Sequence, residues 1–117
     1  MGQLKIERRD AGKVTVLTAT GEVDMTTVAE FETALHAALK PSGRSIILSV
    51  AGVSLMSSSG WGTALAAAKK VRAAGGDIVF ADLSPLMRVV YRELGIAGLL
   101  RSFPTESAAL AALSSKD

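Results

Sequence analysis

Three consecutive serines, Ser57, Ser58 and Ser59, are the residues of this 117-residue chain best suited to carry chemistry. An apolar segment ends just before them at Met56, and Gly60 opens an alanine-rich segment directly after them. A serine hydroxyl can act as a nucleophile, cap a helix or accept a phosphoryl group. One helix cap needs only one serine, so three indicate a further role. A phosphate on Ser58 would face free amides at the positive end of the following helix, where anions are stabilised by about 0.3–1 kcal/mol.

The partners that a catalytic serine requires are missing from this pattern. A nucleophile elbow needs Gly two residues before and after the serine, but Met56 stands two residues before Ser58. His36 is the one histidine and falls in a predicted amphipathic helix, and there is no cysteine; thiolate chemistry and multi-His or Cys-ligated metal sites are therefore excluded. Asp24 and Asp82 follow predicted strands, but no phosphate-cradling loop accompanies them to hold Mg²⁺. We predict no catalytic residue, no metal and no cofactor, and a hydrolase or phosphotransferase using Ser58 is the weakest alternative.

The composition is typical of one folded domain. Hydrophobic residues make up 49% of the chain and charged residues 21%, which excludes a disordered chain. The net charge of +2 is too small to indicate direct binding to nucleic acid or to a membrane surface. The stretch 45–68 has no charge and is long enough to span a bilayer, but its serines and glycines argue against insertion. We predict a single domain over residues 1–117, with a core at about 4–113, in a cytoplasmic protein.

Strands and helices alternate along the predicted chain. Residues 4–7 and 14–20 are predicted to form a hairpin, and the apolar runs 45–50 and 78–81 are typical of central strands buried on both faces. A short last strand is predicted at 99–100. Helices are predicted from apolar residues at helical spacing at about 27–39, 61–74, 84–94 and 105–113.

Two of these helices have specific expected features. The first begins with a capping-box pattern from Thr27 to Glu30. The third is expected to turn an apolar face inward, formed by Leu86, Val89, Val90 and Leu94. The order of elements is that of an α/β protein with a mixed sheet.

Ligands and partners of an open α/β sheet bind at the carboxyl ends of its strands. The serine cluster, Asp24 and Ser84 all follow predicted strands, so we expect them at one edge. Exposed methionine or tryptophan side chains there would suit protein contact, although a tryptophan in a first helical turn is more often buried. The predicted partner-binding residues are Asp24, Met25, Met56, Ser57, Ser59, Gly60, Trp61, Ser84 and Met87.

Three separated motifs resemble the STAS domain, and more narrowly the single-domain anti-sigma factor antagonists of bacteria. They are Gly21-Glu22-Val23-Asp24, Ser58-Ser59-Gly60, and Leu83-Ser84-Pro85-Leu86-Met87-Arg88-Val89-Val90 before Leu94-Gly95. The resemblance covers about residues 4–113. It implies the STAS fold, an α/β fold with a mixed four- to five-stranded β-sheet and about four α-helices packed against it.

The resemblance also implies a regulator and not an enzyme. The unmodified protein would bind an anti-sigma factor with serine kinase activity and so release a sigma factor. Phosphorylation at Ser58, with Ser57 as the second candidate, would break the complex, and a phosphatase would restore it. Asp24 corresponds to the family's acidic residue close to the phosphorylated serine.

Two positions depart from the family pattern. Ser57 stands where the family usually has Asp, and Ser49 stands where it often has Asp. Losing the Asp at position 57 removes a negative charge beside Ser58. This fits weaker recognition by the kinase, a constitutive binder or a divergent partner. The alternative function is a STAS subunit of a lipid-transport ATPase complex, or a signalling scaffold, not controlled by phosphorylation.

Overall fold

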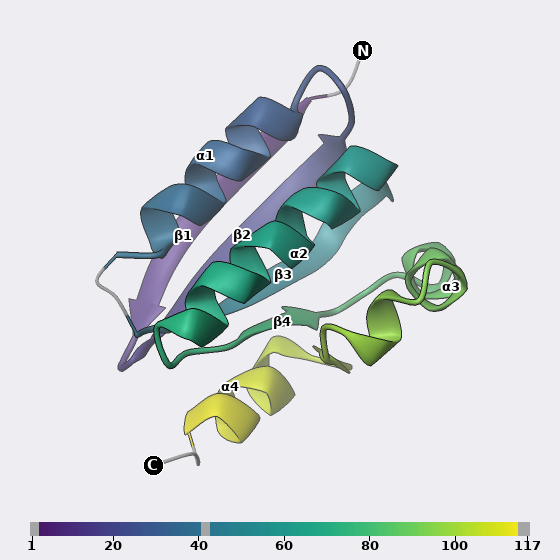
Figure 1. Cartoon of the computed structure of the whole chain (residues 1–117). Helices are drawn as coiled ribbons and strands as arrows, with labels where there is room; N and C mark the ends of the chain where they lie inside the picture. Colours follow the sequence, from purple (N-terminus) through teal and green to yellow (C-terminus); the bar gives the residue numbers. More distant parts are fainter. Residues whose placement is uncertain (1–2, 41–42, 115–117) are drawn as a thin grey trace.

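The computed structural model describes residues 3–40 and 43–114, and these form one five-stranded sheet with four α-helices (Figure 1). The two ends of the predicted range 1–117 lie outside the described residues. The strands lie side by side in chain order: β1 (Leu4–Ala11), β2 (Val14–Val23), β3 (Ser45–Met56), β4 (Ile78–Ala81) and β5 (Ser102–Phe103). Strand β1 is antiparallel to β2, and the other neighbours are parallel. The predicted mixed α/β sheet is confirmed.

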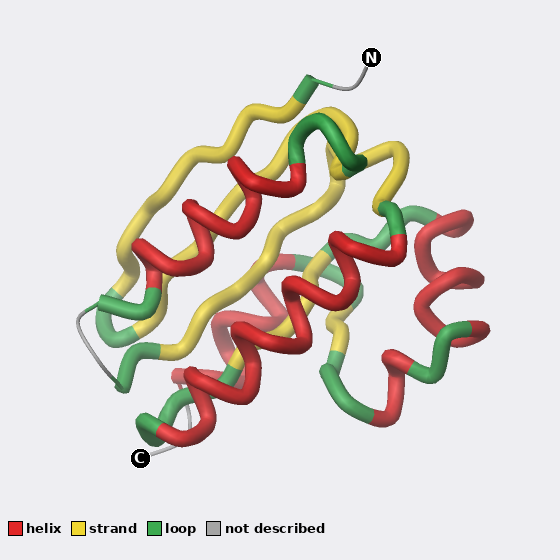
Figure 2. The backbone as a smooth tube through the Cα atoms, turned by 45° about the horizontal axis from the view of Figure 1, so that its top comes forward, coloured by secondary structure: helices red, strands yellow, loops and turns green. Residues whose placement is uncertain are grey.

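Helices cover both faces of the sheet, as Figures 1 and 2 show. Helices α1 (Val28–Ala38), α2 (Ser58–Ala73) and α3 (Pro85–Glu93) pack on one face, and α4 (Glu106–Ser114) packs on the other. A 3-10 turn, Ile96–Gly98, follows α3. No helix in the described part of the chain has the length and apolar content needed to cross a membrane.

The central strands are apolar because both of their faces are buried. Leu17, Leu48 and Phe80 point to α1 and α2, and their neighbours in the strands point to α4. Fully burying such a side chain stabilises the fold by about 1.5–3 kcal/mol. The runs at 45–50 and 78–81 were predictable for this reason.

Strands β2 and β3 run further than predicted. Gly21, expected to end the second strand, lies inside β2 with a φ of +116°, and a Cβ there would lie 2.0 Å from the carbonyl oxygen of Gln3. The glycine therefore allows a close approach of β1 without stopping the strand. The prediction of a strand at 99–100 is wrong, because these residues follow the 3-10 turn and β5 begins at Ser102.

The predicted inner face of α3 is right only at Val90, which packs against the core. Met87 and Tyr91 are its buried residues, whereas the side chains of Leu86, Val89 and Leu94 are at least half exposed. The Ser84 hydroxyl accepts a hydrogen bond from the Met87 amide at 3.2 Å, which starts the helix. Packing of the Tyr91 ring against the core aromatic rings then selects the stripe that faces inward.

Candidate functional site

The carboxyl ends of three parallel strands bring the predicted site together. Asp24 follows β2, the serine cluster follows β3, and Asp82 follows β4. One backbone hydrogen bond joins the first two loops, because the Ser57 amide donates to the Val23 carbonyl at 2.8 Å. The start of α2 is thereby held beside the loop that carries Asp24.

The three serines have different roles at the start of α2. Ser57 is the N-cap, and its hydroxyl oxygen accepts a hydrogen bond from the Gly60 amide at 3.4 Å. The hydroxyls of Ser57 and Ser59 lie 2.9 Å apart and share a hydrogen bond. Ser58 is exposed, and no described residue forms a hydrogen bond with its hydroxyl. Ser58 is therefore the accessible, unengaged hydroxyl of the cluster.

The surroundings of Ser58 favour a negative charge. Helix α2 has 16 residues and no acidic side chain in its first turn. Within residues 3–40 and 43–114, no acceptor is bound by the Ser58 and Ser59 amides. Free amides and the positive end of the helix dipole stabilise anions at such a position.

Gly60 and Trp61, which directly follow the serines, are tightly packed in the core. A Cβ at position 60 would lie 2.6 Å from Met56 Cγ and 2.7 Å from Val23 Cγ1, so only glycine fits there. Trp61 packs edge-on against Phe80, with ring centroids 5.4 Å apart. The position of Ser58 is therefore fixed by the core.

The burial corrects part of the predicted partner surface. The side chains of Met56, Trp61 and Met87 are only 6%, 2% and 3% exposed, and Gly60 is buried. They do not offer contact surface in this structure, because the three side chains belong to the hydrophobic core. Ser84 is half-buried and caps α3.

Asp24 is held within its own loop. Its carboxylate accepts hydrogen bonds from the Thr26 hydroxyl at 2.6 Å and the Thr26 amide at 2.9 Å. Together with weaker contacts from Thr27, these hold the pKa of Asp24 below its ordinary value. The carboxylate is therefore ionised at neutral pH, and in the described residues it makes no hydrogen bond to the serine cluster.

The expected capping box at Thr27 is replaced by a different arrangement. The Thr27 hydroxyl donates to the Glu22 carbonyl at 2.7 Å and accepts from the Asp24 amide at 2.9 Å. Its side chain makes no cap hydrogen bond to α1. Thr27 therefore braces the β2–α1 loop, which sets the position of Asp24 and Met25.

Exposed apolar side chains occur near the carboxyl-terminal ends of β2, β3 and β4 in the sequence. Met25 is 89% exposed, Leu55 near the end of β3 is 49% exposed, and Leu86 in the first turn of α3 is 64% exposed. Leu55 and Leu86 were missed from the sequence, because β3 was expected to end at Val50 and Leu86 was expected to face the core. Exposed apolar side chains of this kind suit protein contact.

Asp82 does not complete a metal-binding site with the other acidic residues in the described part of the chain. It has a φ of +61° where β4 ends, and its amide donates to the Phe103 carbonyl at 3.2 Å. Among the residues that the structure describes, no three His, Cys, Asp or Glu side chains gather to hold a metal ion.

Comparison with known proteins identifies the family. The STAS domain family model matches residues 5–109. The chain belongs to the STAS domain family. An anti-sigma factor antagonist from Mycobacterium paratuberculosis has a similar structure, with a TM-score of 0.84 at 23% sequence identity over 97% of this chain and 96% of that one.

Two further proteins share the fold. The antagonist SpoIIAA in its unphosphorylated form gives a TM-score of 0.78 at 21% identity, over 97% of this chain and 100% of that one. Its phosphorylated form from Bacillus gives 0.69 at 24% identity, over 94% and 98%. A murine anion transporter, solute carrier 26 family member A9, gives 0.79 at 15% identity, over 92% of this chain but 19% of the transporter. The fold therefore occurs both as nearly the whole of a chain and as part of a larger anion transporter.

Proposed function

We propose that this STAS domain is an anti-sigma factor antagonist switched off by phosphorylation at Ser58. The observation that carries the proposal is the exposed Ser58 hydroxyl, unengaged among the described residues and fixed at the positive end of α2. SpoIIAA, which has the same fold, has been solved in an unphosphorylated and a phosphorylated form.

The chemistry of the site explains how such a switch would work. A phosphoryl group adds about −1.5 to −2 charges at neutral pH. The neighbouring surface includes the exposed side chains of Met25 and Leu55. Bringing a phosphate into an apolar contact costs free energy unless the partner supplies positive charge. Phosphorylated Ser58 would therefore disfavour the complex that the unmodified protein forms.

Ser58 is a better acceptor than Ser57. The Ser57 hydroxyl is engaged with the Gly60 amide and with Ser59, and its removal from these contacts would open the cap of α2. Because Ser57 stands where the family usually carries an Asp, the first turn of α2 has no acidic side chain. No negative charge beside Ser58 would therefore repel a phosphate on its hydroxyl.

The proposed partner is an anti-sigma factor with serine kinase activity, and a phosphatase would reset the switch. In this account the protein is a substrate and a regulator in the cytoplasm, and it catalyses no reaction. A second candidate is a STAS component of a membrane transport complex. The match to part of a murine anion transporter supports keeping it, because the same fold serves there inside a larger protein.

A paired-bait experiment separates the two candidates. The wild type, Ser58→Asp, Ser58→Ala and a charge-matched control, Ser107→Asp on α4, are used to capture proteins from lysate of the source cells. We expect the wild type, Ser58→Ala and Ser107→Asp to retain a serine kinase and Ser58→Asp to lose it by at least about tenfold. Equal capture by Ser58→Asp would overturn the switch. Capture of transporter subunits by all four would favour the second candidate.

A further inference from the structure

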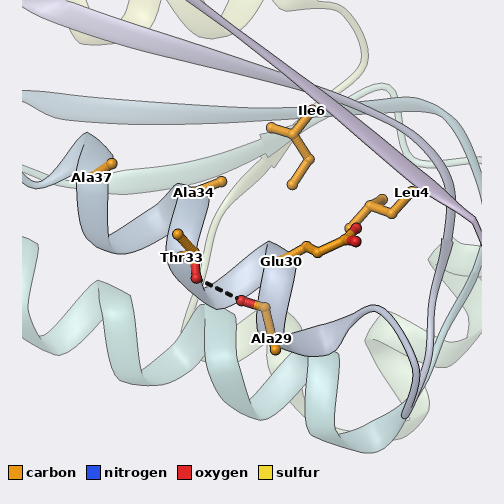
Figure 3. A pocket seen from close by; sticks show the side chains of 7 residues that line it. All are labelled: Leu4, Ile6, Ala29, Glu30, Thr33, Ala34 and Ala37. Atoms are coloured by element: carbon orange, nitrogen blue, oxygen red, sulfur yellow. Dashed lines mark hydrogen bonds between the residues drawn. The ribbon is translucent and has the colours of Figure 1, made fainter.

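The outer edge of β1 and the helix beside it form an open apolar groove. The groove has a volume of about 480 Å³ and lies between Leu4 and Ile6 of β1 and the small residues of α1 (Figure 3). On the helix side it is lined by three alanines, Thr33 and Glu30. The serine cluster follows β3, two strands away in the sheet, and no residue that lines the groove belongs to the proposed switch.

The backbone of β1 is ready to pair on this side. Strand β1 ends the sheet within the described residues, and the Glu22 amide donates to the Gln3 carbonyl at 2.8 Å. Because peptide groups alternate along a strand, the odd-numbered residues of β1 bond to β2. The even-numbered residues, from Leu4 to Asp10, direct their N–H and C=O groups outward. Such a row is a template for another strand.

We propose that this edge pairs with the β1 edge of a second copy of the same chain, antiparallel about a twofold axis at Ile6. Charged side chains on an edge strand normally oppose pairing. In this register they attract, because Lys5 of each copy faces Glu7 of the other. The two residues already form an ion pair at 3.5 Å within one copy, so the dimer would place four alternating charges on one face.

On the groove side, the same register brings two apolar side chains together. Ile6 would face Ile6 of the second copy, which covers an apolar residue that is now only partly buried. Leu4 would face Arg8 of the second copy. The Arg8 guanidinium stays with its own copy, because it already donates to the Ala37 and Lys40 carbonyls and to the Asp10 carboxylate.

The neighbouring registers are unfavourable. Moving the axis to Glu7 places Glu7 against Glu7 and Lys5 against Arg9. Moving it to Lys5 places Lys5 against itself. An axis at Arg8 places Arg8 opposite Arg8 and sets Ile6 against Asp10. Like charges directly opposite each other destabilise a strand pair, so one register is selected.

Sedimentation equilibrium on the whole chain tests the association. We expect a dimer for the wild type at protein concentrations on the order of 100 µM. Glu7→Lys should weaken it by at least about tenfold, because two Lys–Lys pairs replace two attractive pairs. The double swap Lys5→Glu with Glu7→Lys should restore the dimer. Glu93→Lys on α3, which makes the same charge change elsewhere, should leave it intact.

Cysteine cross-linking tests the register, since the natural chain has no cysteine. Directly opposite residues in a hydrogen-bonded pair lie about 5.5 Å apart between Cα atoms, within disulfide range. Ile6→Cys should therefore form a covalent dimer on oxidation, and Leu4→Cys and Glu7→Cys should not. A wild type that stays monomeric, a dimer unaffected by Glu7→Lys, or equal cross-linking by all three variants would overturn the proposal.

Discussion

The two ends of the parallel strands use their polar groups in opposite ways. At the amino-terminal end, Asp77 receives hydrogen bonds from Arg72 at 3.0 Å, Arg101 at 3.2 Å and the Ile78 amide at 2.8 Å. At the carboxyl end, Ser58 is exposed and Met25 is 89% exposed. At the amino-terminal end, charged groups of different elements are joined to each other. At the carboxyl end, the Asp24 carboxylate bonds, among the described residues, only within its own loop, and Ser58 and Met25 stay open to a partner.

A second network repeats the pattern at the amino-terminal end. Arg44 donates to the Thr15 hydroxyl and to the Val14 carbonyl, both at 2.9 Å, and the Thr15 hydroxyl donates to Asp10 at 3.1 Å. We infer from this comparison that the amino-terminal ends of the parallel strands mainly stabilise the fold. The loops around Ser58 are then available for binding a partner. Substitutions at the two ends should therefore separate stability from binding.

The largest expected effect is the loss of stability when Trp61, which packs in the core just after the serine cluster, is replaced. Trp61→Ala should lower the free energy of unfolding by about 3–5 kcal/mol, because it opens a cavity beside Phe80 and Tyr91. Trp61→Phe is the matched control and should cost less, since it keeps a ring and removes a buried N–H that has no partner among the described residues. Urea unfolding measures both. Equal losses would mean that ring packing does not hold the start of α2.

The next effect compares two aspartates, one at each end. Asp77→Asn should lower the free energy of unfolding by about 1–2 kcal/mol, because two arginines lose their charged acceptor. Asp24→Asn should change it by less than about 0.5 kcal/mol, since an amide oxygen still accepts from the Thr26 amide. Urea unfolding of the two variants checks the difference. A larger loss at Asp24 would reverse the assignment of the two ends.

A binding comparison uses two exposed apolar residues. Met25→Ala should weaken binding to the proposed anti-sigma factor partner by about tenfold. Leu99→Ala is the matched control, because Leu99 is 54% exposed near Arg72 at the other end, and it should leave binding unchanged. Calorimetric titration measures both. Equal weakening would place the partner's contact on both ends.

The smallest expected effect is a dependence of stability on pH. Burial raises the pKa of Asp77, but hydrogen bonds from the Ile78 amide, Arg72 and Arg101 outweigh it and hold the pKa below the ordinary value of 3.8. The stabilisation is fully present above that ordinary value and is lost as pH falls through the lower folded pKa. Below about pH 4 the wild type should lose stability more steeply than Asp77→Asn in urea unfolding. Parallel pH profiles would contradict this.

Much of the fold could be predicted because its central signals are unambiguous. The runs at 45–50 and 78–81 are buried on both faces, so every residue in them is apolar or small. The inward face of helix α3 was harder to predict, because two of its faces carry apolar side chains, one with Leu86 and the other with Met87. Contact of Tyr91 with Trp61 decides between them, and that contact joins residues 30 positions apart.

The site was predictable in its location but not in its details. The parallel pairing of β2 with β3 brings Asp24 and the serine cluster to the same end of the sheet, where both strands finish. The unengaged hydroxyl of Ser58 depends on the cap geometry of Ser57 and on the Ser57–Ser59 hydrogen bond. Local sequence does not encode these distances, and it does not show that Trp61 is buried.

Mapping the phosphorylated residue tests the central claim most directly. The protein is incubated with ATP and the anti-sigma factor proposed as its kinase, and the modified residue is assigned by fragmentation in a mass spectrometer. We predict one phosphoryl group, on Ser58, and no modification of Ser58→Ala, whereas Ser57→Ala should still be modified. A phosphate on Ser57 or Ser59, or an unmodified wild type that binds the same partner, would contradict the account.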